Sequence, residues 1–138
     1  PPKLLSQLVH AGYTPIIASI GVTRDGQLVN VNADALAAQL AVNLHATTLM
    51  VAGTTAGVLD IDQRSLPRVN DEDIERLVAN GAISAGMVAK LTSCRAARQG
   101  GVPNVRIIDG RTSINVSAGT GTIIDTTTVV PQKEKAKL

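Results

Sequence analysis

Three short polar side chains stand close together in residues 30–34 of this chain: Asn30, Asn32 and Asp34. An apolar run precedes them and a helical pattern follows, so they lie where a strand passes into the N-terminus of a helix. Ligands bind at such junctions in α/β proteins. Asn32 can cap the helix through its side-chain oxygen, which leaves Asn30 and Asp34 facing the junction. Asn and Asp are also common turn residues, so a purely structural role stays open.

Lys90 is the second candidate for chemistry, because it follows Gly86-Met87 in what we predict to be the first turn of a helix. Backbone N–H groups and the helix dipole favour anions at a helix N-terminus, where a lysine can also neutralise phosphate charge. The alternative for a single lysine is a solvated surface position.

Alternating helices and strands position these candidates. Leu36, Leu40 and Leu44 recur at the spacing of an amphipathic helix, and Asp25-Gly26 is a hairpin-turn signal. We predict helices over residues 3–11, from residue 33 onward, and over 71–80 and 86–99. We predict strands over residues 15–22, 27–31, 48–52, 105–108 and 121–125. Strands that alternate with helices predict a mostly parallel sheet with helices covering both faces.

Composition is consistent with a single α/β domain. The chain has 138 residues, and its 44% hydrophobic content is almost entirely aliphatic, as buried parallel strands require. We assign residues 1–130 to the domain and residues 131–138, which lack apolar periodicity, to a polar tail. No apolar run approaches the roughly 20 residues that span a bilayer, and no signal peptide opens the chain. We therefore expect no membrane partner and a cytoplasmic location.

Several function classes lack support in the sequence. The net charge is only +2, and Tyr13 is the single aromatic residue available to stack on bases, which argues against nucleic-acid binding. His10 and His45 have no neighbours at metal-ligand spacing, so we expect no metal site built by the protein. Cys94, the only cysteine, is expected to be a small buried hydrophobe. The absence of a Walker A pattern excludes a P-loop kinase.

An ordered set of motifs resembles the C-terminal half of the N-acetylglutamate kinases, within the amino-acid kinase superfamily. The resemblance covers roughly residues 4–111. The matching segments are residues 19–23, 25–28, 30–34, 57–60, 86–87 with Lys90, 100–102 and 107–111. Such an ordered set is far more specific than any one motif.

The resemblance implies a three-layer αβα sandwich with a mainly parallel sheet, of which only the C-terminal half is present. It also implies ATP-dependent phosphorylation of the side-chain carboxylate of N-acetyl-L-glutamate in arginine biosynthesis, with Mg²⁺ held mainly through the nucleotide. The implied partners are these substrates, the missing N-terminal half of the kinase and, in the complete protein, further copies in a homo-oligomer. We expect this chain alone to be inactive.

The resemblance further implies roles for single residues. Lys90 would contact the phosphates and stabilise the transition state, Asp34 would orient the catalytic lysines, and Asn30 would bind the α-carboxylate of acetylglutamate. Small residues elsewhere would let backbone amides approach the nucleotide closely. The expected nucleotide-binding residues are Thr54, Thr55, Ala56, Gly57, Val58, Leu59, Ala82, Ile83, Ser84 and Met87.

Three departures from the family pattern keep other functions open. Thr54 stands where relatives usually have Asp, and residues 112–120 form a short segment where relatives usually carry another helix. The acidic residue that helps feedback-inhibited members bind arginine has no counterpart, so we expect no arginine sensing. The alternatives are a divergent non-catalytic binding or regulatory domain and a related acyl-amino-acid kinase.

Overall fold

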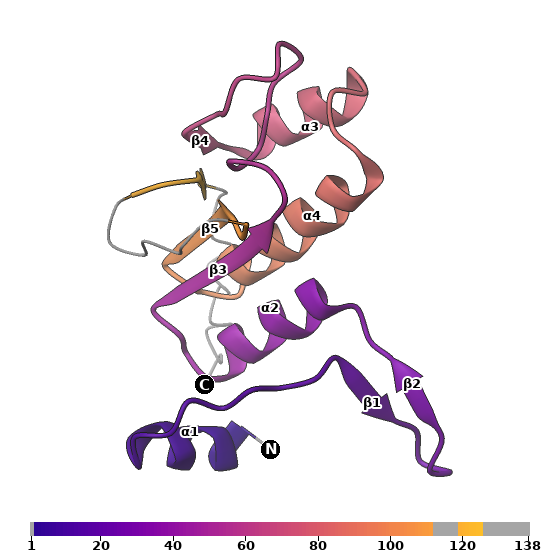
Figure 1. Cartoon of the computed structure of the whole chain (residues 1–138), viewed down its shortest axis with the longest axis vertical. Coiled ribbons are helices and arrows are strands. Elements are labelled where there is room, and N and C mark those ends of the chain that lie inside the picture. The colour runs from indigo at the N-terminus through magenta and orange to yellow at the C-terminus, as the bar shows by residue number, and fades with distance from the viewer. Residues whose placement is uncertain (1, 112–118, 126–138) are drawn as a thin grey trace, which may run out of the picture.

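The computed structural model describes residues 2–111 and 119–125, in which helices and strands alternate (Figure 1). The elements in chain order are α1 (Pro2–His10), β1 (Ile20–Val22), β2 (Leu28–Asn30), α2 (Ala33–Asn43), β3 (Thr48–Gly53), β4 (Arg68–Val69), α3 (Asp71–Ala79), α4 (Ala85–Gln99), β5 (Asn104–Asp109) and β6 (Thr122–Ile124). Each helix and strand predicted from the sequence is present. β1 is shorter than predicted, and the two-residue strand β4 is an addition.

Four strands form the main sheet, in the order β3-β5-β6-β4. β3 and β5 are parallel from the pair Thr48 and Asn104 to the pair Gly53 and Asp109. β4 is parallel to β6, whereas β6 is antiparallel to β5. The structure thus confirms the α/β class and the mainly parallel sheet.

The hydrophobic core lies between this sheet and the helices α2 and α4, which pack side by side (Figure 1). Successive side chains of a strand point to opposite faces, so alternate aliphatic residues of β3 and β5 enter the core. The buried residues at this interface are Leu49, Val51, Val105, Ile107, Ala38, Ala41, Leu91, Cys94 and Ala97. Cys94 is fully buried, as predicted.

Side-chain caps fix where the two helices nearest the candidate residues begin. The Asn32 side chain accepts a hydrogen bond from the backbone N–H of Ala35 at 2.9 Å, which confirms its predicted capping of α2. The Ser84 hydroxyl accepts one from the N–H of Met87 at 3.3 Å. α4 therefore begins at Ala85, one residue before the predicted start.

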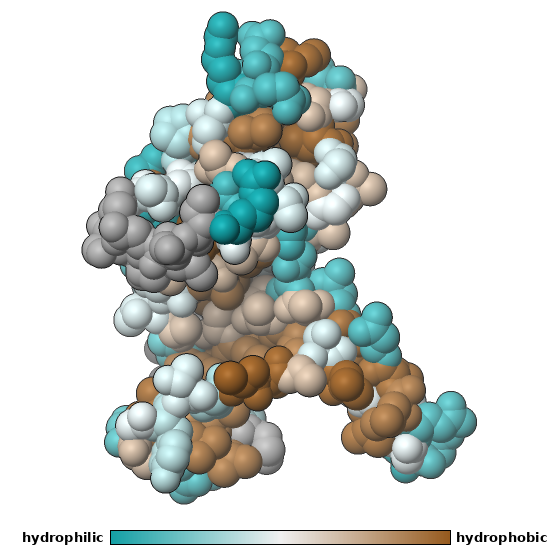
Figure 2. Space-filling view, in the orientation of Figure 1, coloured by the Kyte–Doolittle hydropathy of each residue, from teal (hydrophilic) through white to brown (hydrophobic). Residues whose placement is uncertain are grey.

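Residues 2–31, which we call the N-terminal arm, contain no buried residue. Within the arm, β1 and β2 pair with each other as an antiparallel hairpin in which Ile20 lies opposite Asn30. The strand predicted over residues 15–22 begins only at Ile20, because residues 15–18 have no partner strand in the described part of the chain. Figure 2 shows hydrophobic surface across the arm, at the bottom of the view.

Two predictions concern residues that the structure does not describe. The polar tail at residues 131–138 lies outside the described ranges, and so do residues 112–118 of the short segment. Within the described ranges, no helix combines the length and the apolarity needed to cross a membrane.

Candidate functional site

The loops that follow β3 and β5 leave the same edge of the sheet. Gly53 at the end of β3 lies opposite Asp109 at the end of β5, and the N–H of Gly110 donates to the Gly53 carbonyl at 2.8 Å. α/β sheets bind ligands at the edge where parallel strands end. The predicted nucleotide loop, residues 54–59, starts at this edge.

Thr122 of β6 holds this loop in place. Its hydroxyl accepts a hydrogen bond from the N–H of Val58 at 2.8 Å and donates one to the carbonyl of Leu66 at 2.6 Å. Gly57 has a φ of +131°, and a Cβ there would lie 2.5 Å from the Thr122 hydroxyl oxygen, so only glycine fits. We identified Gly57 from the sequence but missed Thr122, because 64 residues separate it from Val58.

A cavity of about 220 Å³ lies between this loop and the start of α4. The lining residues are Thr55, Leu59, Gln63, Ala82, Ile83, Ser84 and Met87. Six of these seven are residues that the sequence predicts to contact nucleotide, and the fold brings their two separate segments together. The seventh, Gln63, was not predicted.

Four further residues of the predicted nucleotide set do not line the cavity. Thr54 and Ala56 are exposed, whereas Gly57 and Val58 are buried against Thr122. The residues of this loop therefore face in different directions, and among them only Thr55 and Leu59 line the cavity.

Lys90 of α4 and Asp34 of α2 form an ion pair between the two helices. The Lys90 Nζ lies 3.1 Å from each of the two Asp34 carboxylate oxygens. The side chains of Lys90 and Asp34 are only 24% and 22% exposed, so solvent screens the pair incompletely. The structure thus brings these two predicted site residues together, and the orienting role of Asp34 stays a prediction.

Lys90 lies in the second turn of α4, so our placement in the first turn was wrong. The helix begins at Ala85, and the dipole acts mainly within the first turn. Lys90 would therefore act on an anion through its own charge. Met87, three residues earlier, shares a helix face with Lys90 and lines the cavity.

Cys94 lies one turn beyond Lys90 in the core. Burial raises the pKa of its thiol from 9.0 to about 12, with a further rise from the Asp34 carboxylate and an opposing effect of the Lys90 ammonium. The thiol stays protonated at neutral pH, so it is not a nucleophile.

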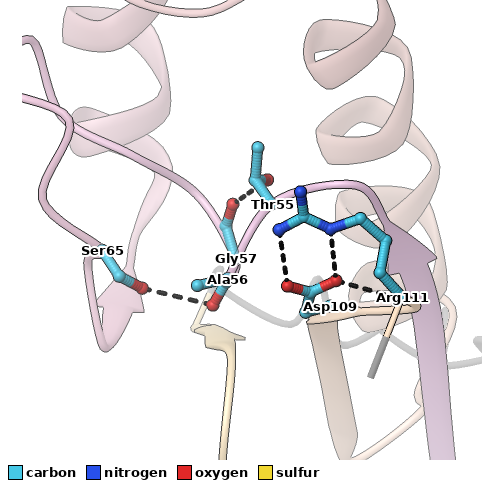
Figure 3. Close-up of polar contacts among 6 residues, drawn as sticks. All are labelled: Thr55, Ala56, Gly57, Ser65, Asp109 and Arg111. Carbon is cyan, nitrogen blue, oxygen red and sulfur yellow. Dashed lines mark hydrogen bonds and ion pairs between the residues drawn. The ribbon is translucent and has the colours of Figure 1, made fainter. Parts of the chain in front are cut away.

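Asp109 and Arg111 form a bidentate ion pair beside the loop (Figure 3). Arg111 Nε donates to one Asp109 carboxylate oxygen at 3.0 Å and Nη2 to the other at 2.8 Å. These hydrogen bonds are the main reason that the pKa of Asp109 falls from 3.8 to about 2. On the other side of the loop, the Ser65 hydroxyl donates to the Ala56 carbonyl at 3.3 Å.

Asn30 stands apart from the cavity. It is the last residue of β2, and its side chain is exposed. That side chain makes no hydrogen bond to any residue within 2–111 and 119–125. No described contact joins Asn30 to Lys90 or to the cavity lining, although only three residues separate it from Asp34 in the chain.

Sequence comparison shows a match to the amino acid kinase family over residues 2–109. The acetylglutamate kinase of Afipia carboxidovorans is 39% identical over 127 residues, which is 88% of this chain and 43% of that protein. The acetylglutamate kinase of Methylobacillus flagellatus is 40% identical over 129 residues, which is 89% of this chain and 44% of that protein. The chain thus spans less than half the length of these curated relatives.

Solved structures agree on the fold. A crystal structure of a Streptococcus mutans protein matches with a TM-score of 0.78 and 29% identity over 90% of this chain and 47% of that one. N-acetylglutamate synthase from Neisseria gonorrhoeae, complexed with coenzyme A and L-arginine, matches with a TM-score of 0.79 over 88% of this chain and 30% of that one. Because the identity is only 23%, the second match supports the fold alone.

Proposed function

The chain belongs to the amino acid kinase family, and from this premise we propose that it supplies the nucleotide-binding half of an acetylglutamate kinase. The reaction is transfer of the γ-phosphoryl group of ATP to the side-chain carboxylate of N-acetyl-L-glutamate, in arginine biosynthesis. One observation carries the proposal: α4 and its N-cap Ser84 bring Ser84 and Met87 to the cavity and Lys90 to Asp34. A single helix therefore offers a nucleotide lining beside a cation suited to phosphate.

Phosphoryl transfer needs charge neutralisation and alignment more than covalent work by side chains. A lysine ammonium has three N–H donors. In this proposal the Asp34 carboxylate, 3.1 Å from Nζ through both oxygens, holds the Lys90 ammonium in one position and leaves a donor for a phosphoryl oxygen. Lys90 then stabilises the negative charge of the migrating group.

In this proposal, magnesium binds together with the nucleotide. The described residues contain no group of three His, Cys, Asp or Glu side chains that could hold a metal ion. We propose that Mg²⁺ is held mainly by the phosphates of ATP and by water. When bound, it neutralises charge on the phosphates.

Asn30 is our candidate for binding the acceptor. Its amide can donate to the α-carboxylate of acetylglutamate, and its side chain is exposed and has no hydrogen-bond partner in the described ranges. Asn30 precedes α2, whose first turn carries Asp34.

We propose that the complete enzyme needs a second half, which covers the N-terminal arm. The relatives are more than twice as long as the part that this chain matches, and the arm exposes large apolar side chains, among them Ile16 at 97% and Leu28 at 77%. The chain alone should bind ATP weakly and phosphorylate nothing. The complete protein should be a cytoplasmic homo-oligomer.

Thr54 bears on the non-catalytic alternative. Because Thr54 is exposed and does not line the cavity, its presence in place of the usual Asp removes no lining group. No feature of the described residues favours a purely regulatory domain over the kinase.

A coupled assay of ADP release with the full-length protein, ATP and N-acetyl-L-glutamate tests the proposal. We expect turnover that depends on the acetylated substrate, with other acyl-amino acids as controls. Faster turnover of another acyl-amino acid would make the protein a related kinase. Normal ATP binding without turnover of any acyl-amino acid would make it a binding or regulatory domain.

A further inference from the structure

Thr122 is fully buried although its side chain is polar, and the main sheet sets its position. In β6 it pairs with Ile107 of β5 in the antiparallel ladder. Gly121 precedes it with a φ of +85°, and a Cβ there would overlap the carbonyl oxygen of Ile107. Glycine therefore lets β6 approach β5 this closely. The Thr122 hydroxyl is thus held at a fixed point of the sheet.

This hydroxyl is inserted at the base of residues 58–66, which we call the cavity hairpin. The N–H of Leu66 donates to the Val58 carbonyl at 2.8 Å, so the two residues lie opposite each other. In an antiparallel pair of this kind, two residues exchange both of their N–H···O bonds. Here the Thr122 hydroxyl replaces the second bond: it accepts from the Val58 N–H at 2.8 Å and donates to the Leu66 carbonyl at 2.6 Å.

The cavity hairpin carries part of the cavity wall. Leu59 follows the base of the hairpin, and Gln63 lies in its closing turn; both line the cavity. The Asp60 carboxylate organises that turn by accepting hydrogen bonds from the N–H groups of Asp62 at 2.9 Å and Arg64 at 2.8 Å. The hairpin is therefore fixed at its turn by Asp60, and its base is fixed to the sheet by Thr122.

The segment before the hairpin also contacts Thr122. A Cβ on Gly57 would lie 2.5 Å from the Thr122 hydroxyl oxygen, so the loop packs directly against this hydroxyl. The Thr55 hydroxyl in turn donates to the Gly57 carbonyl at 2.7 Å. Thr55 is the remaining lining residue on this side of the cavity, so Thr122 contacts the base of the whole wall that faces α4.

We propose that Thr122 is a positioning residue for nucleotide binding, whose hydroxyl holds this wall in the arrangement that receives ATP. The inference rests on the proposed function. Thr122 does not line the cavity, so it acts on the nucleotide only through the wall. Without the hydroxyl, the N–H of the fully buried Val58 loses its partner, and the hairpin shifts to satisfy it. Binding must then restore the wall, which lowers the apparent affinity.

Thr122→Val removes the hydroxyl and keeps the shape of the side chain. In the complete protein we expect the affinity for a non-hydrolysable ATP analogue to fall roughly 5- to 30-fold, as for the loss of one or two hydrogen bonds. KM for ATP should rise in step. Because the ion pair of Lys90 with Asp34 keeps both partners, kcat at saturating ATP and KM for acetylglutamate should stay within about 3-fold. Calorimetry measures the affinity, and steady-state kinetics measures KM and kcat.

Two matched variants separate this role from a loss of stability. Thr122→Ser keeps the hydroxyl and leaves a void in place of the methyl group, so the melting temperature should fall while the ATP-analogue affinity stays near that of the wild type. Ile124 is another buried residue of β6 and does not line the cavity. Ile124→Val should lower the melting temperature and leave both KM values unchanged. If Thr122→Val does not fold, Thr122→Ala removes the same hydroxyl and should show the same loss of affinity.

The outcomes distinguish this inference from the proposed function. Wild-type affinity for the ATP analogue in Thr122→Val or Thr122→Ala would overturn the positioning role and leave the kinase proposal standing. An equal loss in Thr122→Ser or Ile124→Val would also overturn it, because the hydroxyl would then not be the cause. If the wild type bound the analogue but turned over no acyl-amino acid, the kinase proposal would fail, and the affinities of the variants would still decide the role of Thr122. A wild type that binds no nucleotide would overturn both.

Discussion

The N-terminal arm and the rest of the described chain differ in how they use apolar side chains. The arm, residues 2–31, has no buried residue, whereas residues 32–111 and 119–125, which we call the body, hold the entire described core. Nine of the eleven large hydrophobic side chains that are exposed in the described ranges belong to the arm. Local structure therefore forms in both regions, but only the body encloses its apolar faces.

The difference also divides the candidate site. Every residue that lines the cavity lies in the body, as do Lys90 and Asp34. Asn30, the candidate for the acceptor, lies in the arm. Exposed apolar patches of this kind mark interaction surfaces. In the proposed function, the body thus carries the candidate nucleotide residues, and the arm carries the candidate acceptor residue.

Paired variants of Lys90 and Asn30 give the largest expected effects. Lys90→Met keeps the stem and removes the charge, so in the complete enzyme kcat should fall by roughly two to four orders of magnitude with a smaller change in KM for ATP. Asn30→Ala should chiefly raise KM for acetylglutamate, because the α-carboxylate is remote from the reacting carboxylate. Steady-state kinetics with each substrate varied in turn measures both.

Circular dichroism of the two variants provides the folding control. A Lys90→Met enzyme with near-normal kcat would leave Lys90 as a partner for Asp34 only. An Asn30→Ala enzyme whose kcat falls as far as that of Lys90→Met would contradict the assignment of Asn30 to acceptor binding and of Lys90 to phosphoryl transfer.

Two identical Leu→Ala changes compare the packing of the regions. Leu91 in α4 is fully buried, so Leu91→Ala should lower the free energy of unfolding of this chain by about 2–5 kcal/mol. Leu28 in β2 is 77% exposed, and Leu28→Ala should stay within about 0.5 kcal/mol. Urea unfolding followed by circular dichroism measures both changes.

The same pair of variants sharpens the comparison in the complete protein. If a second half covers the arm, the cost of Leu28→Ala should rise there, while the cost of Leu91→Ala stays similar. An unchanged cost of Leu28→Ala in the complete protein would show that the surface around Leu28 stays uncovered.

Features fixed by neighbours in the chain were predictable from the sequence. The capping of α2 by Asn32 and the ends of α3 and α4 near Gly81 and Gly100 follow from local hydrogen bonds and backbone preferences. The alternation of strands and helices then predicted the sheet. Six cavity-lining residues were identified through the family resemblance.

Features fixed by distant partners were not predictable in this way. Thr122 contacts Val58 across 64 residues, and β4 has only two residues, too few for a pattern. Gln63 adopts a positive φ where glycine is the usual signal, so nothing marked it as the tip of a turn. The apolar run at residues 15–22 predicted a long strand, but strand formation needs a partner, and only three of those residues find one.

The last expected effect concerns Cys94, and it should come from the body alone. Burial raises the pKa of this thiol from 9.0 to about 12, so between these values the folded protein keeps a proton that the unfolded chain loses. This contribution to stability is fully present below pH 9 and disappears as the pH rises toward 12. The loss amounts to about 1.4 kcal/mol per pH unit at most.

Cys94→Ala creates a small void, whose cost is a constant offset at every pH, and it removes the titration. The difference in unfolding free energy between wild type and Cys94→Ala should therefore be flat up to pH 9 and shrink above it. Lysine and arginine titrate in both proteins, so their effects cancel in the difference. A difference that stays flat to pH 11 would mean that solvent reaches the thiol, and that the body is less tightly closed around α4 than the contrast with the arm requires.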